Sequence, residues 1–129
     1  MAEKPKFYFC PHCHNLVEKV NDSGVPIICC GEEMIELTGN TVDAAHEKHV
    51  PEIAQEGNMV TVKVGSVDHP MIPAHYIQWI VLATTHGIQR RPLSPGEKPV
   101  ATFALLPGES VVAAYEYCNL HGLWKKELA

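Results

Sequence analysis

Apolar and polar residues alternate along part of this chain with the period of a β-strand. In NMVTVKVG, residues 58–65, Val60, Val62 and Val64 alternate with polar side chains. Three further segments are rich in β-branched and aromatic residues and are separated by turns that contain Pro and Gly: HYIQWIVLATT (75–85), VATFALL (100–106) and ESVVAAYEYC (109–118). This spacing predicts a mainly β fold whose larger part is an antiparallel β-sandwich.

The first part of the chain is too short to bury a core of its own. FYFCPHCHNLVEKVNDSGVPIICCGEEMIEL, residues 7–37, predicts two short strands around the turn NDSGVP, with a pair of cysteines at each end. A module of this size folds around a disulfide, a metal or a partner. A break at TGN, residues 38–40, predicts two domains, at residues 1–38 and 39–129.

The segment after this break has a different pattern. TVDAAHEKH, residues 41–49, predicts one helical turn or a short helix, with Thr41 or Asp43 as its N-cap, and no sustained helical period follows it.

Charge and hydropathy narrow the classes of partner. Ten Lys and Arg against fifteen Asp and Glu give a net charge of -5, without a basic block that would follow a phosphate backbone, so no nucleic acid is expected. No apolar run approaches the roughly 20 residues of a membrane span, and MAEKPKFYFC does not read as a signal peptide. We therefore expect no membrane association and a cytoplasmic location.

Five cysteines in such a chain indicate metal ligands or reactive thiols rather than a disulfide framework. Cys10 and Cys13 form a CxxC pair, and Cys29 and Cys30 follow as neighbours after fifteen residues. Four thiolates in two pairs can surround one tetrahedral metal ion. A structural zinc ribbon usually has a second CxxC, and the strain of an adjacent pair favours a redox iron site, although zinc stays open from the sequence.

The fifth cysteine lies near the end of the chain with a histidine three positions later, Cys118 and His121. Three more histidines, His49, His69 and His75, precede it, mostly in loop-like stretches at strand ends. A blue-copper site is the weaker interpretation, since no methionine follows His121 as an axial ligand. Four imidazoles and one thiolate exceed the tetrahedral preference of zinc, whereas iron accepts five ligands and keeps a sixth position open.

These motifs together resemble those of the desulfoferrodoxin family, the two-iron superoxide reductases, over nearly the whole chain. The resemblance is carried by CPHC…CC, TVDAAHEKHVP, KVGSVDHPM, HYIQW and EYCNLHGLW. It implies a desulforedoxin-like first domain and an immunoglobulin-like sandwich of the neelaredoxin type. It also implies two iron ions, one held by Cys10, Cys13, Cys29 and Cys30, the other by His49, His69, His75 and His121 in a plane with Cys118 on the axis.

The resemblance implies that superoxide is reduced to hydrogen peroxide with electrons from a rubredoxin-like donor, in a homodimer. Glu47 and Lys48 would be catalytic: Lys48 attracts the anion and orients a water that delivers a proton, and Glu47 fills the sixth position of the oxidised iron. His12, His14, His46 and His86 are expected not to be ligands. Two alternatives remain, an electron-transfer metalloprotein without superoxide chemistry and a zinc-stabilised binding module.

Overall fold

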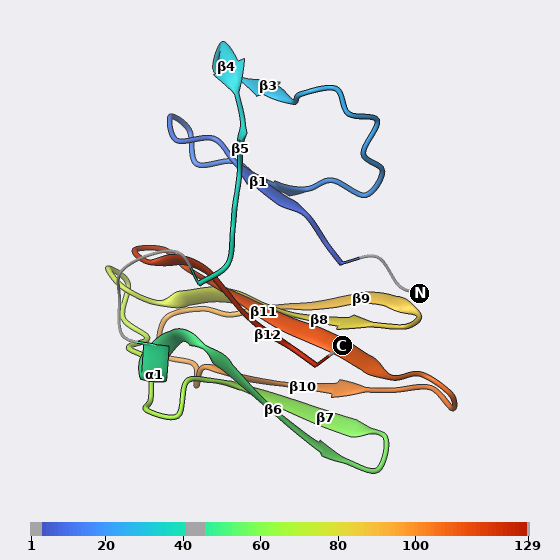
Figure 1. Cartoon of the computed structure of the whole chain (residues 1–129). Helices are drawn as coiled ribbons and strands as arrows, with labels where there is room; N and C mark the ends of the chain where they lie inside the picture. Colours follow the sequence, from blue (N-terminus) through green and yellow to red (C-terminus); the bar gives the residue numbers. More distant parts are fainter. Residues whose placement is uncertain (1–3, 41–45, 129) are drawn as a thin grey trace.

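A computed structural model describes residues 4–40 and 46–128, and β-strands make up nearly all of its regular structure (Figure 1). One helical turn, α1 (His46–His49), lies among the strands. The strands are β1 (Phe7–Phe9), β2 (Leu16–Glu18), β3 (Ile28–Cys29), β4 (Glu32–Glu33), β5 (Ile35–Glu36), β6 (Pro51–Glu56), β7 (Met59–Val64), β8 (Ile77–Thr84), β9 (Gly87–Pro92), β10 (Val100–Ala104), β11 (Val111–Cys118) and β12 (Gly122–Glu127).

Two antiparallel sheets form a sandwich, as the sequence pattern predicts. One has the strand order β10-β7-β6 and the other β12-β11-β8-β9. The alternating valines of β7 are fully buried between them, where they pack with Ile80 and Leu82 of β8 and Phe103 of β10. The mainly β fold with its sandwich is therefore confirmed.

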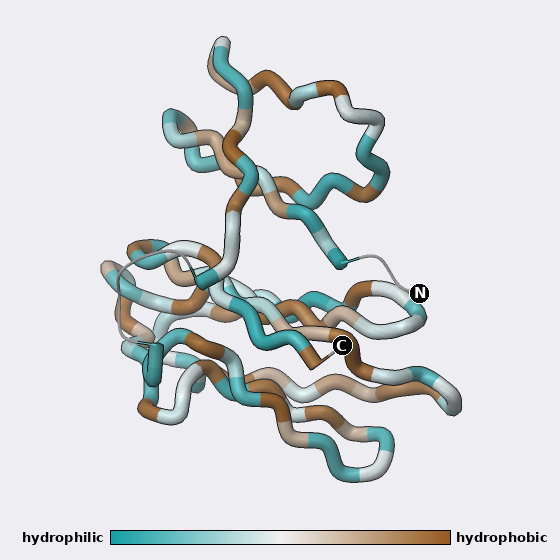
Figure 2. Tube along the Cα trace, in the orientation of Figure 1, coloured by the Kyte–Doolittle hydropathy of each residue, from teal (hydrophilic) through white to brown (hydrophobic). Residues whose placement is uncertain are grey.

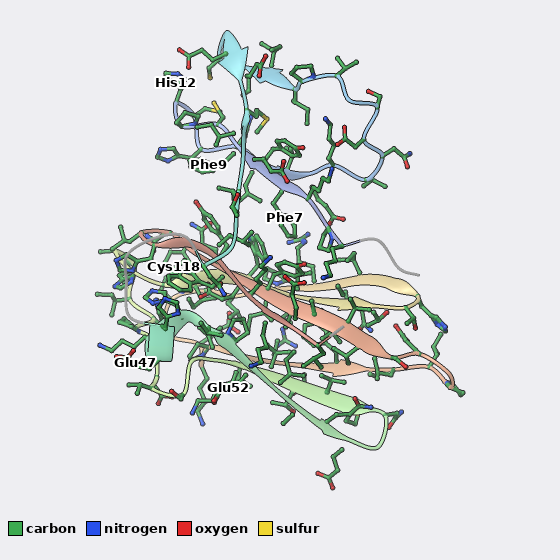
Figure 3. All side chains as sticks on the ribbon, viewed as in Figure 1. Phe7, Phe9, His12, Glu47, Glu52 and Cys118 are labelled. Atoms are coloured by element: carbon green, nitrogen blue, oxygen red, sulfur yellow. The ribbon has the colours of Figure 1, made fainter. Side chains whose placement is uncertain are left out.

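The central strands β8 and β11 are buried on both faces, which explains why they read as continuous apolar runs. Their outer face, with Trp79, Tyr115 and Tyr117, is covered by the N-terminal lobe, residues 4–38. Phe7 of this lobe lies 4.9 Å from Trp79 and 5.8 Å from Tyr115, measured between ring centroids (Figure 3). The small lobe thus completes its burial against the sandwich.

The pairing inside the lobe differs from the prediction. The strands on either side of NDSGVP, β2 and β3, do not pair with each other. Instead β2 pairs with β1, β1 also pairs with β5, and β3 pairs with β4. Each cysteine pair therefore has a tight turn of its own, because short hairpins close locally more easily than across a long loop.

The alternation pattern did not single out β6, β9 and β12. All three are edge strands, paired on one side only. Most side chains of β6 and β9 are exposed, so their sequences lack a continuous apolar face. In Figure 2 the hydrophilic colours gather at the turn between β6 and β7, while hydrophobic segments follow the strands of the sandwich.

The structure describes only the last part of the predicted helical segment, as α1. The proposed caps Thr41 and Asp43 lie outside the described residues. Just before them, the side-chain amide of Asn40 donates to the carbonyl of Lys125 on β12 and its oxygen accepts from the N–H of Lys125, which ties the segment directly after the lobe to the sandwich. The domain boundary between residues 38 and 39 stays a prediction. Across the described ranges, no helix has the length and apolar character needed to cross a membrane.

Two candidate metal centres

Four imidazole rings lie next to one another in a closed cycle at one end of the sandwich. His49 ends α1, His69 and His75 lie between β7 and β8, and His121 lies in the turn between β11 and β12. Neighbouring rings in the cycle 49–69–75–121 have centroids 4.7 to 5.0 Å apart and are nearly perpendicular, at 77° to 89°. Such an arrangement directs one nitrogen of each ring toward a common centre.

The spacing of the nitrogens distinguishes between coordination geometries. His49 Nε2 lies 3.0 Å from His121 Nδ1 and 3.2 Å from His69 Nε2. With metal–nitrogen bonds of about 2.1 Å, two ligands at a right angle are about 3.0 Å apart and two tetrahedral ligands about 3.4 Å. The first distance equals the right-angle value, and the second lies midway between the two values.

Cys118 adds a sulfur to this group from the end of β11 (Figure 3). Its Sγ lies 3.9 Å from His121 Nδ1, and the donor atoms of the four histidines and this cysteine all lie within 4.8 Å of one another. We refer to these five residues as the His4Cys group. Burial raises the pKa of the Cys118 thiol, and the N–H groups of Leu120 and His121 oppose that shift. A thiolate here therefore needs a cation beside it.

His69 and His75 are held as neutral imidazoles, which can offer a nitrogen lone pair to a metal ion. His69 holds its Nδ1 2.7 Å from the carbonyl of Pro70, so that Nε2 carries the free lone pair, and burial lowers the pKa of His69 to about 4. Burial, followed by the charges of His121 and Lys48, also lowers the pKa of His75. His75 Nε2 is buried without a hydrogen-bond partner. A metal ion fits this donor set, because it would satisfy that nitrogen.

The turn after β7 holds α1 in place. Gly65 has φ +78° and donates its N–H to the carbonyl of Val50, while Val67 N–H donates to the carbonyl of Glu47. A Cβ at position 65 would lie 2.5 Å from the backbone carbonyl oxygen of Glu47, so only glycine fits there. Sequence reasoning did not single out this residue, although its place directly after a strand is a signal.

Trp124 of β12 supports the group from the side. Its ring stacks on His49 at 4.9 Å and 26°, and its indole N–H donates to the carbonyl of His121 at 3.0 Å. Two of the four imidazoles therefore share one rigid, fully buried support.

The two predicted catalytic residues, Glu47 and Lys48, are both exposed on α1. The charge of Lys48 acts on His75. Glu47 instead lines a hollow of about 410 Å³ together with Ser66 and Lys126, and no member of the His4Cys group lines it. Glu47, labelled beside α1 in Figure 3, thus lines a hollow apart from the His4Cys group.

The four N-terminal cysteines also converge, with their sulfurs within 4.8 Å of one another. Cys13 Sγ lies 3.5 Å from Cys29 Sγ, close to the roughly 3.8 Å between two tetrahedral thiolates with 2.3 Å metal–sulfur bonds. Cys30 adopts a positive φ of 52°. This left-handed conformation is how two adjacent cysteines both reach one centre.

Hydrogen bonds shift the pKa values of the N-terminal cysteine thiols in opposite directions. The backbone N–H of Cys13 lowers the pKa of Cys10 to about 6. Hydrogen bonding with Cys13 raises the pKa of Cys29 and takes that of Cys30 to about 12. Without a cation the second pair therefore keeps its protons, and four thiolates together require a metal ion.

The two histidines beside this cluster make other contacts. His12 Nε2 lies 3.1 Å from a carboxylate oxygen of Glu32, and His14 stacks on Phe9 with ring centroids 5.5 Å apart.

Comparison with known proteins agrees with both centres. The sequence model of the family described as Desulfoferrodoxin matches residues 41–127. This chain belongs to the desulfoferrodoxin family. A desulfoferrodoxin of Syntrophotalea carbinolica is 50% identical over 127 residues, which cover 98% of this chain and 99% of that protein. Desulfoferrodoxins carry two iron centres, and this chain has a four-cysteine group and a His4Cys group for them.

Solved structures extend the comparison. The superoxide reductase from Treponema pallidum superimposes with a TM-score of 0.81 at 41% identity, covering 97% of this chain and 100% of that one. A superoxide reductase described as 1Fe-SOR, from Giardia intestinalis, gives a TM-score of 0.55 at 38% identity and covers 64% of this chain and 99% of its own. The desulfoferrodoxin fold of this chain is thus shared with superoxide reductases.

Two residues close to Cys118 escaped the sequence reasoning. Glu116 is fully buried, both of its carboxylate oxygens lack a hydrogen-bond partner, and burial raises its pKa well above the ordinary value. The alternation along β11 puts Glu116 on the same inward face as Cys118, which is the signal that could have found it. Asn119 follows Cys118 directly, and its side chain bonds to the segment that carries His75.

Proposed function

We propose that this chain is an oxidoreductase that reduces superoxide to hydrogen peroxide at the His4Cys group. Each superoxide takes up one electron and two protons, and no dioxygen forms. The observation that carries the proposal is the convergence of four imidazole nitrogens and one sulfur within 4.8 Å, more donors than a tetrahedral ion accepts. The similarity to superoxide reductases along nearly the whole chain supports it.

In detail, we propose that His49, His69, His75 and His121 bind iron in a plane, with Cys118 on the axis of a square pyramid. The near-perpendicular rings and the 3.0 Å spacing between His49 Nε2 and His121 Nδ1 support a square of nitrogens. We further propose that Cys10, Cys13, Cys29 and Cys30 hold a second iron, that a rubredoxin-like protein donates the electron, and that the chain forms a homodimer.

The residues of the chain have separate tasks in this reaction. Ferrous iron held by these residues would supply the electron that reduces superoxide. Lys48 adds a positive charge that acts on His75, and this charge would attract an anion against the overall charge of -5 and orient a water as proton source. Cys118 contributes the electron-rich thiolate that stabilises the oxidised metal. The side chain of Glu47, which lines the hollow apart from the His4Cys group, would turn toward this group once the product has left.

Three measurements on the iron-loaded protein test the proposal. A pulse of superoxide should yield one hydrogen peroxide per superoxide consumed, without dioxygen, whereas a dismutase would release dioxygen. Azide should change the visible spectrum of the second centre, because an open position accepts it. A protein without superoxide chemistry that serves only electron transfer would show neither result, and a zinc module would be colourless.

Lys48→Ile should slow the reaction with superoxide roughly tenfold at low ionic strength, because the local positive charge that draws the anion is lost. The deficit should shrink as salt is added, since ions screen an exposed charge. Stopped-flow or pulse-radiolysis rates over a series of salt concentrations measure both effects.

Lys126→Ile is the matched control, since it removes the same charge from β12, beside the hollow that Glu47 lines. It should leave the rate close to that of the unmodified protein. Equal rates for Lys48→Ile and the unmodified protein at low salt would remove the steering role.

Metal affinity at the His4Cys group should rise about tenfold per pH unit between roughly pH 7 and 9. The pKa of His69 is about 4 and that of His75 is also lowered, so these imidazoles are neutral in this range. Burial raises the pKa of the Cys118 thiol, so metal binding must displace its proton. Titration with Co²⁺ at several pH values, followed by the sulfur-to-cobalt absorption of this site, measures the slope. An affinity independent of pH would show that the thiol is not a ligand.

A further inference from the structure

The side chain of Asn119 makes hydrogen bonds to the residues before and after His75. Its Oδ1 accepts a hydrogen bond from the N–H of Tyr76 at 2.9 Å, and its Nδ2 donates to the carbonyl of Ala74 at 3.1 Å. The backbone N–H of Asn119 also donates to the carbonyl of Tyr76 at 3.2 Å. Three hydrogen bonds from one residue therefore hold the two neighbours of His75.

These three hydrogen bonds join the two segments that carry three members of the His4Cys group. Asn119 lies between Cys118 and His121, and residues 74–76 are more than forty positions earlier in the sequence. The named strands end just short of this point, since β8 begins at Ile77, and the backbone hydrogen bond from the N–H of Asn119 to the carbonyl of Tyr76 extends the ladder between β11 and β8. The side-chain oxygen of Asn119 supplies the acceptor for the N–H of Tyr76.

His75 depends on its backbone for its position more than His69 and His49 do. His69 is oriented by the carbonyl of Pro70 and His49 by the stacked ring of Trp124. His75 Nε2 has no hydrogen-bond partner, and apart from the Asn119 contacts its loop is closed by two backbone hydrogen bonds with Ile72. A shift of the 74–76 backbone would thus move the imidazole directly.

From these contacts we infer that Asn119 is a positioning residue, which fixes His75 against the Cys118–His121 turn and so assembles the fourth imidazole of the site before metal arrives. The inference rests on the proposed function for the identity of the site. Asparagine suits this task because one side chain accepts and donates at the same time. Aspartate would keep the acceptor for Tyr76 but set a second acceptor against the Ala74 carbonyl.

Asn119→Ala should bind Co²⁺ at the His4Cys group at least about tenfold more weakly, the lower end of what loss of a supporting contact costs a metal site. Asn119→Asp should also bind more weakly. Co²⁺ alone is titrated into the metal-free full-length chain, and the sulfur-to-cobalt absorption of each site is followed. The four-cysteine site should fill as in the unmodified chain and serves as the internal reference.

Asn40→Ala is the matched control. Asn40 also clamps a backbone with both ends of its amide, at Lys125 of β12, and its partner is not next to a ligand. It should lower the melting temperature about as much as Asn119→Ala without weakening Co²⁺ binding. In the Co²⁺-free chain, Asn119→Ala alone should speed hydrogen exchange of the Tyr76 amide, which a general loss of stability would not do selectively.

Co²⁺ binding by Asn119→Ala that matches the unmodified chain, or that weakens no more than in Asn40→Ala, would overturn the inference. Failure of the proposed function would look different. Iron-loaded unmodified protein would then leave superoxide unconsumed, while Asn119→Ala would still weaken Co²⁺ binding.

Discussion

Cys118→Ser should abolish the visible thiolate-to-iron band of the second centre and reduce the rate of superoxide reduction by more than about a hundredfold, beyond the 10- to 100-fold typical of supporting residues. Sulfur is the one soft, electron-rich donor among five, and a serine hydroxyl neither ionises in this range nor donates comparable charge. The position is fully buried, so no solvent molecule can readily take the place of the sulfur. Absorption spectra of the ferric protein and superoxide kinetics on the same sample provide the measurement.

Ala114→Ser controls for the cost of a buried hydroxyl. Ala114 is fully buried and lies on the same inward face of β11 as Cys118, without belonging to the His4Cys group. Its variant should lose stability yet keep both the band and the activity. Retention of band and activity in Cys118→Ser would show that the sulfur is not bound to the metal.

Cys13→Ser should lower the iron content from two to one per chain while superoxide reduction stays within about a factor of two, less than about 0.5 kcal/mol in the barrier. The four-cysteine group lies wholly in the N-terminal lobe, whereas every donor of the other group belongs to the sandwich, which has a core of its own.

The lobe itself should loosen in Cys13→Ser, because metal binding is part of the folding energy of so small a module. Hydrogen exchange should rise in β1, β2 and β5 and stay unchanged in β7 and β10, which belong to the sheet that the lobe does not cover. Val20→Ser, at a 79% exposed position of the same lobe, should keep both irons. If Cys13→Ser lost the second iron as well, the two centres would depend on each other through the contact between lobe and sandwich.

Much of the fold could be read from local patterns. The valines of β7 alternate as a half-buried strand should, and the runs that became β8 and β11 are apolar because a lobe covers their second face. The sequence pattern did not predict the polar edge strands β6 and β9. They form strands because they pair with a neighbouring strand, and their own residues carry no clear strand pattern. The strands beside NDSGVP paired with other neighbours than expected, because each forms a short hairpin with the strand nearest to it along the chain.

The sequence by itself determined the kinds of donor atom and the β-period, since residue type and short spacing carry both. Only the tertiary structure decided that the ring nitrogens of His49 and His121, 72 positions apart, lie 3.0 Å from each other. It also decided that Glu47 lines a hollow apart from the His4Cys group and that Asn119 reaches across to the loop of His75. The reason is physical: long-range strand pairing and register set these distances, and no spacing along one stretch of chain encodes them.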